Sequence, residues 1–167
     1  MRKIKIFLTV GTHPQQFDRL IKAVDELVAA KQINGEIASQ IGNSNYKPKN
    51  FSFKTMMGKE EYEKNFKNAD IVICHAGEGA IIDGLNYKKK LIVVPRLKKF
   101  DEHTDDHQMD LVKKLASENK IIGVYDVKDL ELAIKKTTRF FPKIASNKKG
   151  LIKALNDYLG SVERWNF

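Results

Sequence analysis

"DIVICHAGEGAIIDGLNYKKKLIVVP", residues 70–95, decides the fold of this chain. The stretch begins and ends with continuous apolar runs, 70–74 and 91–95, which are typical of strands covered on both faces of a parallel sheet. Between them lie a turn with glycines and a segment long enough for a helix. The stretch therefore predicts a strand–helix–strand unit whose two strands are parallel.

The same alternation of strands and helices extends over nearly the whole chain. Apolar residues at 4–10 predict a first strand, and apolar residues at helical spacing from 17 to 28 predict the helix after it. The order predicts an α/β fold with a single Rossmann-like, doubly wound, mainly parallel sheet. The other expected elements are strands at 35–42, 50–56 and 120–125, and helices at 59–68, at 105–117 and from 126 onward.

One domain, 1–167, is expected for a chain of this length. Its last part, 144–167, is expected to be an amphipathic helical tail, because its apolar residues fall on one helical stripe. The tail would either pack on its own domain or, with the basic aromatic stretch "TTRFFPK" (137–143), dock on a partner or a membrane surface.

The charge balance favours anionic partners. The chain has 30 Lys and Arg against 21 Asp and Glu, a net charge of +9. Nucleic acid, an anionic membrane surface and a phosphorylated small molecule all fit this charge, and a solvated lysine-rich surface is the alternative. No signature of a known RNA-binding module is present, which argues against nucleic acid.

Cysteine content and hydropathy bear on the compartment. A single cysteine, Cys74, allows no disulfide within the chain and indicates a reducing compartment, for which the cytoplasm is the default. The apolar run at 4–10 is too short for a signal peptide, and no apolar stretch approaches the roughly 20 residues that span a bilayer. Any membrane contact is therefore expected to be peripheral or through a partner.

In doubly wound sheets, ligands bind beyond the carboxyl ends of the strands. Gly77 and Gly79 follow such a strand and would let backbone amides face outward at a helix N-terminus, which attracts anions. A tight turn that only packs helix against strand is the alternative interpretation. The stretch lacks the Lys-Ser or Lys-Thr of a Walker A loop and does not follow the first strand as an NAD fingerprint does, so a dinucleotide oxidoreductase is disfavoured.

Polar side chains near this turn suggest a sugar-bearing ligand. Asp83 is expected about one turn into the helix, where a carboxylate would repel a phosphate but could accept hydrogen bonds from a ribose diol. A solvent-facing aspartate is the alternative. His107 and Gln108 would lie in the first turn of another helix and can both donate to and accept from hydroxyls. A helix start between His103 and His107 would break their spacing, so no metal site is expected.

Three stretches together resemble a known enzyme family. They are "FLTVGTHPQQFDRLIKAVDEL" (7–27), "ADIVICHAGEGAIIDGL" (69–85) and "KKLIVVPRLKKFDEHTDDHQMDLVKKL" (89–115). They resemble the soluble catalytic subunits of two-component glycosyltransferases, including PssE/EpsF-like bacterial proteins and the dolichol chitobiose synthase subunit. More distantly, they resemble the glycosyltransferase family 28 C-terminal, MurG-like donor domain.

The resemblance implies the C-terminal donor half of a GT-B glycosyltransferase. The implied reaction is inverting transfer of a hexosyl group (GlcNAc, Gal or Glc) from a UDP-sugar to a lipid-diphosphate-linked sugar. Neither a metal nor another cofactor is expected. The acceptor would be bound by a separate, membrane-anchored subunit, which would recruit this cytoplasmic chain to the cytoplasmic face of the membrane.

The resemblance also implies roles for individual residues. His13 is the catalytic candidate, as a general base or as a group that stabilises the leaving group, although the partner chain could supply the base. Asp83 would hold the ribose, where the family commonly has glutamate, and backbone near 53–55 would contact uracil. Glu78 stands where related chains often have a small residue, and would either turn outward or touch a sugar hydroxyl or the acceptor. Residues expected on the donor diphosphate are Gly11, Thr12, His75, Ala76, Gly77, Glu78, Gly79 and Ala80, and those expected on the donor sugar are Arg96, His107 and Gln108.

Three other functions remain as alternatives. A non-catalytic sugar-nucleotide sensor or scaffold would use the same site without transfer. An RNA-binding domain would use the basic surface and would show steeply salt-dependent affinity. A UDP-sugar epimerase on a related fold normally needs two halves in one chain, so the length argues against it.

Overall fold

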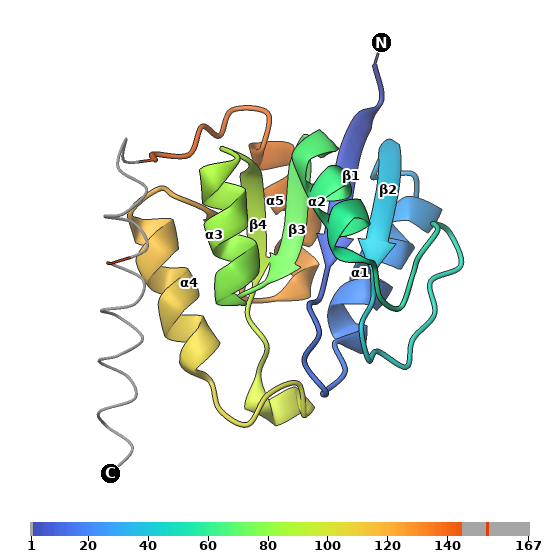
Figure 1. Ribbon diagram of the computed structural model, residues 1–167, viewed down its shortest axis with the longest axis horizontal. Coiled ribbons are helices and arrows are strands. Elements are labelled where there is room, and N and C mark those ends of the chain that lie inside the picture. The colour runs from blue at the N-terminus through green and yellow to red at the C-terminus, as the bar shows by residue number, and fades with distance from the viewer. Residues whose placement is uncertain (1, 145–152, 154–167) are drawn as a thin grey trace.

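The computed structural model describes residues 2–144 and residue 153. It confirms the predicted α/β class: five parallel strands form one sheet in the order β2-β1-β3-β4-β5, with helices on both faces (Figure 1). The strands are β1 (Ile4–Thr9), β2 (Gly35–Gln40), β3 (Ile71–His75), β4 (Lys90–Val94) and β5 (Ile122–Gly123). Apart from its first residue and residue 153, the predicted tail 144–167 lies outside the described residues.

The helices follow the strands in the predicted alternation. They are α1 (Asp18–Ala29), α2 (Lys59–Asn68), α3 (Glu78–Asn86), α4 (His107–Ser117) and α5 (Leu130–Lys136), with short 3₁₀ helices η1 (Lys98–Phe100) and η2 (Val127–Asp129). No helix in the described part of the chain is both long and apolar enough to span a bilayer.

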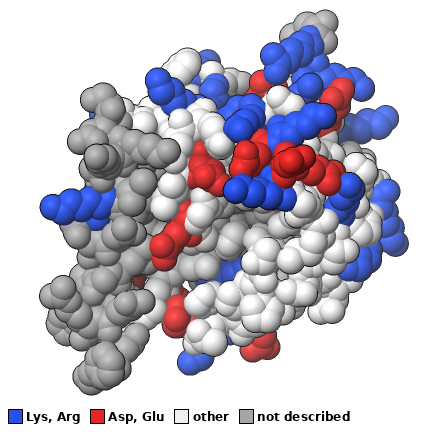
Figure 2. Space-filling model, in the orientation of Figure 1, with Lys and Arg blue, Asp and Glu red and all other residues white. Residues whose placement is uncertain are grey.

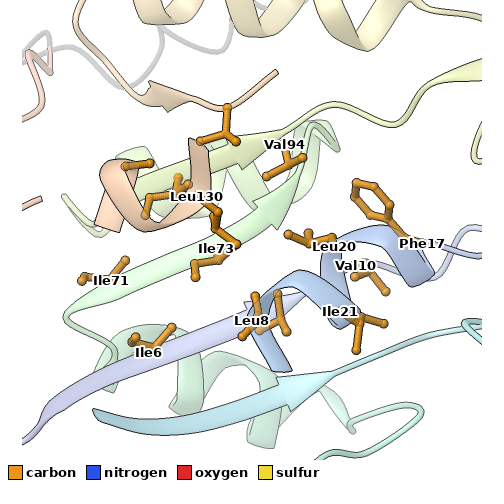
Figure 3. Packing of buried hydrophobic residues seen from close by; sticks show 14 of the residues in the cluster. Ile6, Leu8, Val10, Phe17, Leu20, Ile21, Ile71, Ile73, Val94 and Leu130 are labelled. Carbon is orange, nitrogen blue, oxygen red and sulfur yellow. The ribbon is translucent and has the colours of Figure 1, made fainter. Parts of the chain in front are cut away.

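Two apolar layers hold the helices to the sheet. On one face, Phe66 of α2, Ile81 of α3 and Leu111 of α4 pack on alternate residues of β1, β3 and β4, and Figure 1 shows α2 and α3 in front of the sheet with α4 beside α3. On the other face, α1 and α5 pack on the remaining strand residues (Figure 3). Because β3 and β4 are covered on both sides, their sequences read as continuous apolar runs.

The strand order reverses between β1 and β3. From β1 the chain first adds β2 on one side, and then crosses back to add β3 on the other side. The loops that follow these two strands therefore diverge, which leaves a crevice between them at the carboxyl edge of the sheet.

The predicted strand at 50–56 is wrong. It pairs only through a single bridge between Lys54 and Gln40 at the end of β2. The preceding loop is held against α1, because the buried Asp25 carboxylate accepts hydrogen bonds from the backbone N–H groups of Lys49 and Asn50 (2.8–3.1 Å). The segment meets only the end of β2 and the residues just after it, through hydrogen bonds from Lys54 N to Ser39 O and from Ile41 N to Lys54 O (both 2.9 Å). The predicted strand at 120–125 is confirmed in part, as the two residues of β5.

Candidate functional site

A cleft of about 490 Å³ opens at the carboxyl ends of β1 and β3. Its volume lies within the range of small-molecule sites, and it occupies the topological switch point, where ligands of such sheets bind. The cleft is lined by Gly11, Thr12, Gln40, Met56, Met57, Lys59, Tyr62, His75, Gly77, Gly79, Ala80 and Asp83.

The N-terminus of α3 forms one wall of this cleft. The helix begins at Glu78 after the extended Gly77 (φ −80°, ψ 135°), and the first intrahelical bond runs from Ile81 N to Gly77 O (3.1 Å). The first N–H groups of a helix have no acceptor within it. Since Gly79 and Ala80 line the cleft, these groups suit an anion bound there.

His75 packs between two glycines at the floor of the cleft. A Cβ on Gly77 would lie 2.1 Å from His75 Nε2, and a Cβ on Gly11 would lie 2.5 Å from His75 Cε1. Gly11 also has a φ of +71°, which other residues rarely adopt. Burial and the nearby charge of Arg96 lower the pKa of His75 to about 4, so the imidazole is neutral at pH 7.

The opposite wall comes from residues that sequence reasoning missed. Met56 and Met57 precede α2, and Lys59 and Tyr62 belong to its first turn. The phenol ring of Tyr62 packs edge-on against Phe7 with 5.3 Å between ring centroids, and burial raises its pKa. The predicted helix at 59–68 could have indicated these residues. In a parallel α/β fold the helices start at the edge of the sheet where ligands bind, and α2 starts at Lys59.

His13 lies next to the cleft residue Thr12 and stacks on His103, with 4.9 Å between ring centroids and 24° between planes. Burial, then the positive charges of Arg96 and His103, lower the pKa of His13. Its Nδ1 accepts a hydrogen bond from Gln15 N (3.3 Å). In the neutral ring the proton is therefore on Nε2, and that atom is a donor.

Arg96 does not have the position expected of a donor-sugar residue. Its side chain is 1% exposed, and its guanidinium donates to the carbonyls of Val10, Gln15 and Gln16 and of Glu102 (2.8–3.1 Å). A group occupied in this way cannot also reach a sugar hydroxyl. We therefore correct its expected role from sugar contact to support of the loops.

The cleft unites only part of the predicted site. Gln108 Oε1 accepts a hydrogen bond from Arg96 N (2.9 Å), which leaves its amide NH₂ as the free function, and His107 is exposed at the start of α4. α4 begins at His107, so His103 lies outside the helix and the two histidines do not have helical spacing, as predicted. The expected residues that line the cleft are Gly11, Thr12, His75, Gly77, Gly79, Ala80 and Asp83; those outside its described lining are His13, Ala76, Glu78, Arg96, His107 and Gln108.

Ala76 and Glu78 differ from the other residues of their turn. Ala76 is 3% exposed and belongs to the core under α3, whereas Glu78 is exposed. This exposure is compatible with both outcomes expected for Glu78, an outward position and a contact with a sugar hydroxyl or the acceptor. Among the residues that the structure describes, no three His, Cys, Asp or Glu side chains are grouped so as to hold a metal ion.

Basic side chains do not form one continuous patch on the face drawn in Figure 2. Acidic side chains lie among the Lys and Arg side chains there, and a large area of that face carries neither. This mixed pattern gives little support to the RNA-binding alternative, which needs a basic surface.

The chain shares sequence with proteins named UDP-N-acetylglucosamine transferase subunit ALG13. It is 30% identical to the human protein over 125 residues, which is 70% of this chain, and 38% identical to that of Candida albicans over 68 residues, which is 41% of this chain. The chain spans only 10% of the length of the human relative and 22% of the Candida protein.

Solved structures share the fold. The solution structure of ALG13 superimposes with a TM-score of 0.63 at 17% identity, covering 92% of this chain and 96% of that one. MurG of Acinetobacter baumannii gives a TM-score of 0.53 at 21% identity, covering 88% of this chain and 42% of MurG. The sequence profile of the glycosyltransferase family 28 C-terminal domain matches residues 5–158. Because that match covers most of the chain, the chain belongs to the glycosyltransferase family 28 C-terminal domain family.

Proposed function

We propose that this chain is the donor-binding, catalytic subunit of an inverting two-chain glycosyltransferase. It binds a UDP-sugar and transfers a hexosyl group (GlcNAc, Gal or Glc) to a lipid-diphosphate-linked sugar. One observation carries the proposal: the N-terminus of α3 and the carboxylate of Asp83 line the same cleft at the switch point of the sheet. The names of the curated relatives, which are UDP-N-acetylglucosamine transferase subunits, support the donor class.

In this proposal, the diphosphate lies on the backbone N–H groups at residues 77–80, with Gly11, Thr12 and the neutral His75 beside it. Lys59 adds a positive charge from the opposite wall. These groups stabilise the charge that develops on UDP as it leaves, and a fixed set of donors is an efficient way to do so. No metal has a part in the proposal.

Asp83 receives the ribose. It follows the start of α3 by five residues, so its carboxylate and the helix N-terminus face different parts of one ligand. The sugar then extends from the cleft toward His107 and the amide NH₂ of Gln108 on α4. Backbone near 53–55, beside Met56, is the proposed neighbour of uracil.

His13 is proposed to act at the reacting end of the donor. Because the neutral ring carries its proton on Nε2, the tautomer favours donation to the leaving diphosphate over removal of a proton from the acceptor. The general base is then assigned to the partner chain. The tautomer of His13, which is not suited to remove a proton from the acceptor, also favours a second candidate function, a sugar-nucleotide-binding subunit without catalysis.

The partner and location are part of the proposal. A membrane-anchored subunit supplies the acceptor side and brings this chain to the cytoplasmic face of the membrane. Support comes from the word "subunit" in the names of the relatives. An assay of transfer from a UDP-sugar panel, with and without the candidate subunit, separates catalysis from binding alone.

Replacement of Asp83 tests the ligand position. Asp83→Ala removes the acceptor for the ribose hydroxyls and is expected to weaken UDP binding by about 1–3 kcal/mol, measured by calorimetry, with Asp83→Asn between it and wild type. Asp110→Asn on the exposed side of α4 is the matched control and should bind UDP as wild type does. Unchanged UDP affinity in both Asp83 variants would refute the assigned site.

A further inference from the structure

A buried network of charges joins the two loops on either side of the proposed donor sugar. Glu102 and Arg96 are 0% and 1% exposed, so both charges lie beneath the surface. Arg96 Nη1 donates to Gln15 O (3.0 Å), Gln16 O (2.9 Å) and Glu102 O (3.1 Å), and Nη2 donates to Val10 O (2.8 Å). One side chain from the loop after β4 thus holds the loop after β1.

Arg19 of α1 binds the same loop from the other direction. Its Nε and Nη2 donate to the two carboxylate oxygens of Glu102 (2.9 and 2.8 Å), and Nη2 also donates to Pro95 O (3.1 Å). Glu102 Oε2 in addition accepts from Leu97 N (3.0 Å). A two-point contact between a guanidinium and a carboxylate fixes orientation as well as distance.

On the basis of the proposed function, we propose that Arg19, Glu102 and Arg96 form a clamp that positions the donor-sugar side of the site. The clamp holds His103 where its ring stacks on His13 (4.9 Å), since His103 directly follows Glu102. It also holds α4, because Arg96 N donates to Gln108 Oε1 (2.9 Å). All three are positioning residues and touch no substrate.

The clamp reaches the part of the site proposed for UDP only through the loop after β1, which contributes Gly11 and Thr12. Among the described residues that line the cleft, none belongs to the clamp. The wall formed by α3 is held by core packing of Ile81 and Leu85 instead. A loosened clamp should therefore impair recognition of the sugar more than recognition of UDP.

The test compares UDP with UDP-GlcNAc in variants of the clamp. Glu102→Gln keeps the size of the side chain and the backbone carbonyl that accepts from Arg96, and it removes the charge that pairs with Arg19. Calorimetry is expected to show the affinity for UDP-GlcNAc falling about tenfold and the affinity for UDP falling by a smaller factor. The nuclear Overhauser effect between the rings of His13 and His103 should be present in wild type and lost in the variant.

Two further variants keep the test decisive. Arg19→Lys retains the charge without the two-point contact, so it should show a smaller loss of UDP-GlcNAc affinity, and it provides the same readouts if Glu102→Gln does not fold. Glu63→Gln, from an exposed pair with Lys67, is the control and should match wild type. The proposed clamp would be overturned if UDP and UDP-GlcNAc lost affinity equally. It would also be overturned if the ring contacts persisted in a variant that kept wild-type affinity. If wild type bound neither nucleotide, the proposed function would fail, while the ring contacts would still decide whether the clamp positions the histidines.

Discussion

The two glycines of the HAGEGA turn should respond in opposite ways to the same substitution. A Cβ at Gly77 would lie 2.1 Å from Nε2, 2.7 Å from Cε1 and 3.0 Å from Cδ2 of His75. A Cβ at Gly79 would meet nothing within 4 Å. Neither residue has a positive φ, so the difference is steric and owes nothing to backbone strain.

The size of each effect follows from these contacts. Gly77→Ala must displace the His75 ring, which cannot move freely because Gly11 contacts it from the other side. Overpacking of this kind costs about 1–3 kcal/mol, which for a chain of this size lowers the melting temperature by about 2–10 °C. Gly79→Ala replaces glycine in the first turn of α3 and should stabilise the fold by about 0.5 kcal/mol.

Binding separates the two variants a second time. The methyl group of Gly79→Ala enters the open space of the cleft, where the diphosphate is proposed to lie. Loss of one hydrogen bond to a charged phosphate costs about 1.5–3 kcal/mol, so UDP affinity should fall at least about tenfold even though stability rises. Thermal denaturation and calorimetry on the same samples measure both effects.

Either of two results would refute the reasoning. A Gly77→Ala protein as stable as wild type would show that His75 is not fixed between the glycines. A Gly79→Ala protein with wild-type affinity for UDP would show that the N-terminus of α3 does not face the ligand. Gly58→Ala, where a Cβ also meets nothing within 4 Å and the residue does not line the cleft, controls for the added methyl group.

Four other outcomes are expected. The pKa of His75 is lowered to about 4 in the folded chain, so the stability that the neutral ring contributes is complete above its unfolded pKa of about 6.5. This contribution falls by up to about 1.4 kcal/mol per pH unit as the pH drops toward 4. Denaturant titrations of wild type and His75→Asn over this pH range measure the loss. Cys74 is fully buried and its pKa is raised to about 12, so it should react with a disulfide reagent only at the rate of unfolding. Lys59→Gln should weaken UDP binding several-fold and reduce its salt dependence, whereas Lys64→Gln on the same helix should not. Asp25→Ala leaves the hydroxyl of Tyr46 and two backbone N–H groups without their acceptor, and should lower the free energy of unfolding by about 2–4 kcal/mol in a denaturant titration.

The elements that the sequence predicted well are those whose evidence is local. Apart from Asp70, the runs 70–74 and 91–95 are apolar on both alternating faces, which a two-sided environment explains, and both are strands close to those bounds. The segment 50–56 also contains residues that favour strands, yet the loop before it is held by Asp25, more than 20 residues earlier in the chain. No periodicity within the segment carries that information.

The site divides in the same way. Most residues predicted in the turn after β3 do line the cleft, because the strand, the glycines and the helix N-terminus are consecutive in sequence. Arg96 also comes shortly after a strand, but its side chain donates to three backbone carbonyls of the loop after β1 and to one of its own loop. Lys59 and Tyr62 were missed because their helix has an ordinary charged sequence, and only the sheet order brings its first turn opposite α3.

The arrangement of charges in the cleft indicates how a ligand would be oriented there. The positive groups, Lys59 and the N-terminus of α3, lie on opposite walls, and the negative Asp83 lies further along the same helix. His75 also lines the cleft and is neutral, so it adds no positive charge that would offset the carboxylate. A ligand with phosphate at one end and a diol at the other matches these charges only in one orientation. On this reasoning the glycines serve the ligand indirectly, because they make room for a neutral imidazole at the floor of the site.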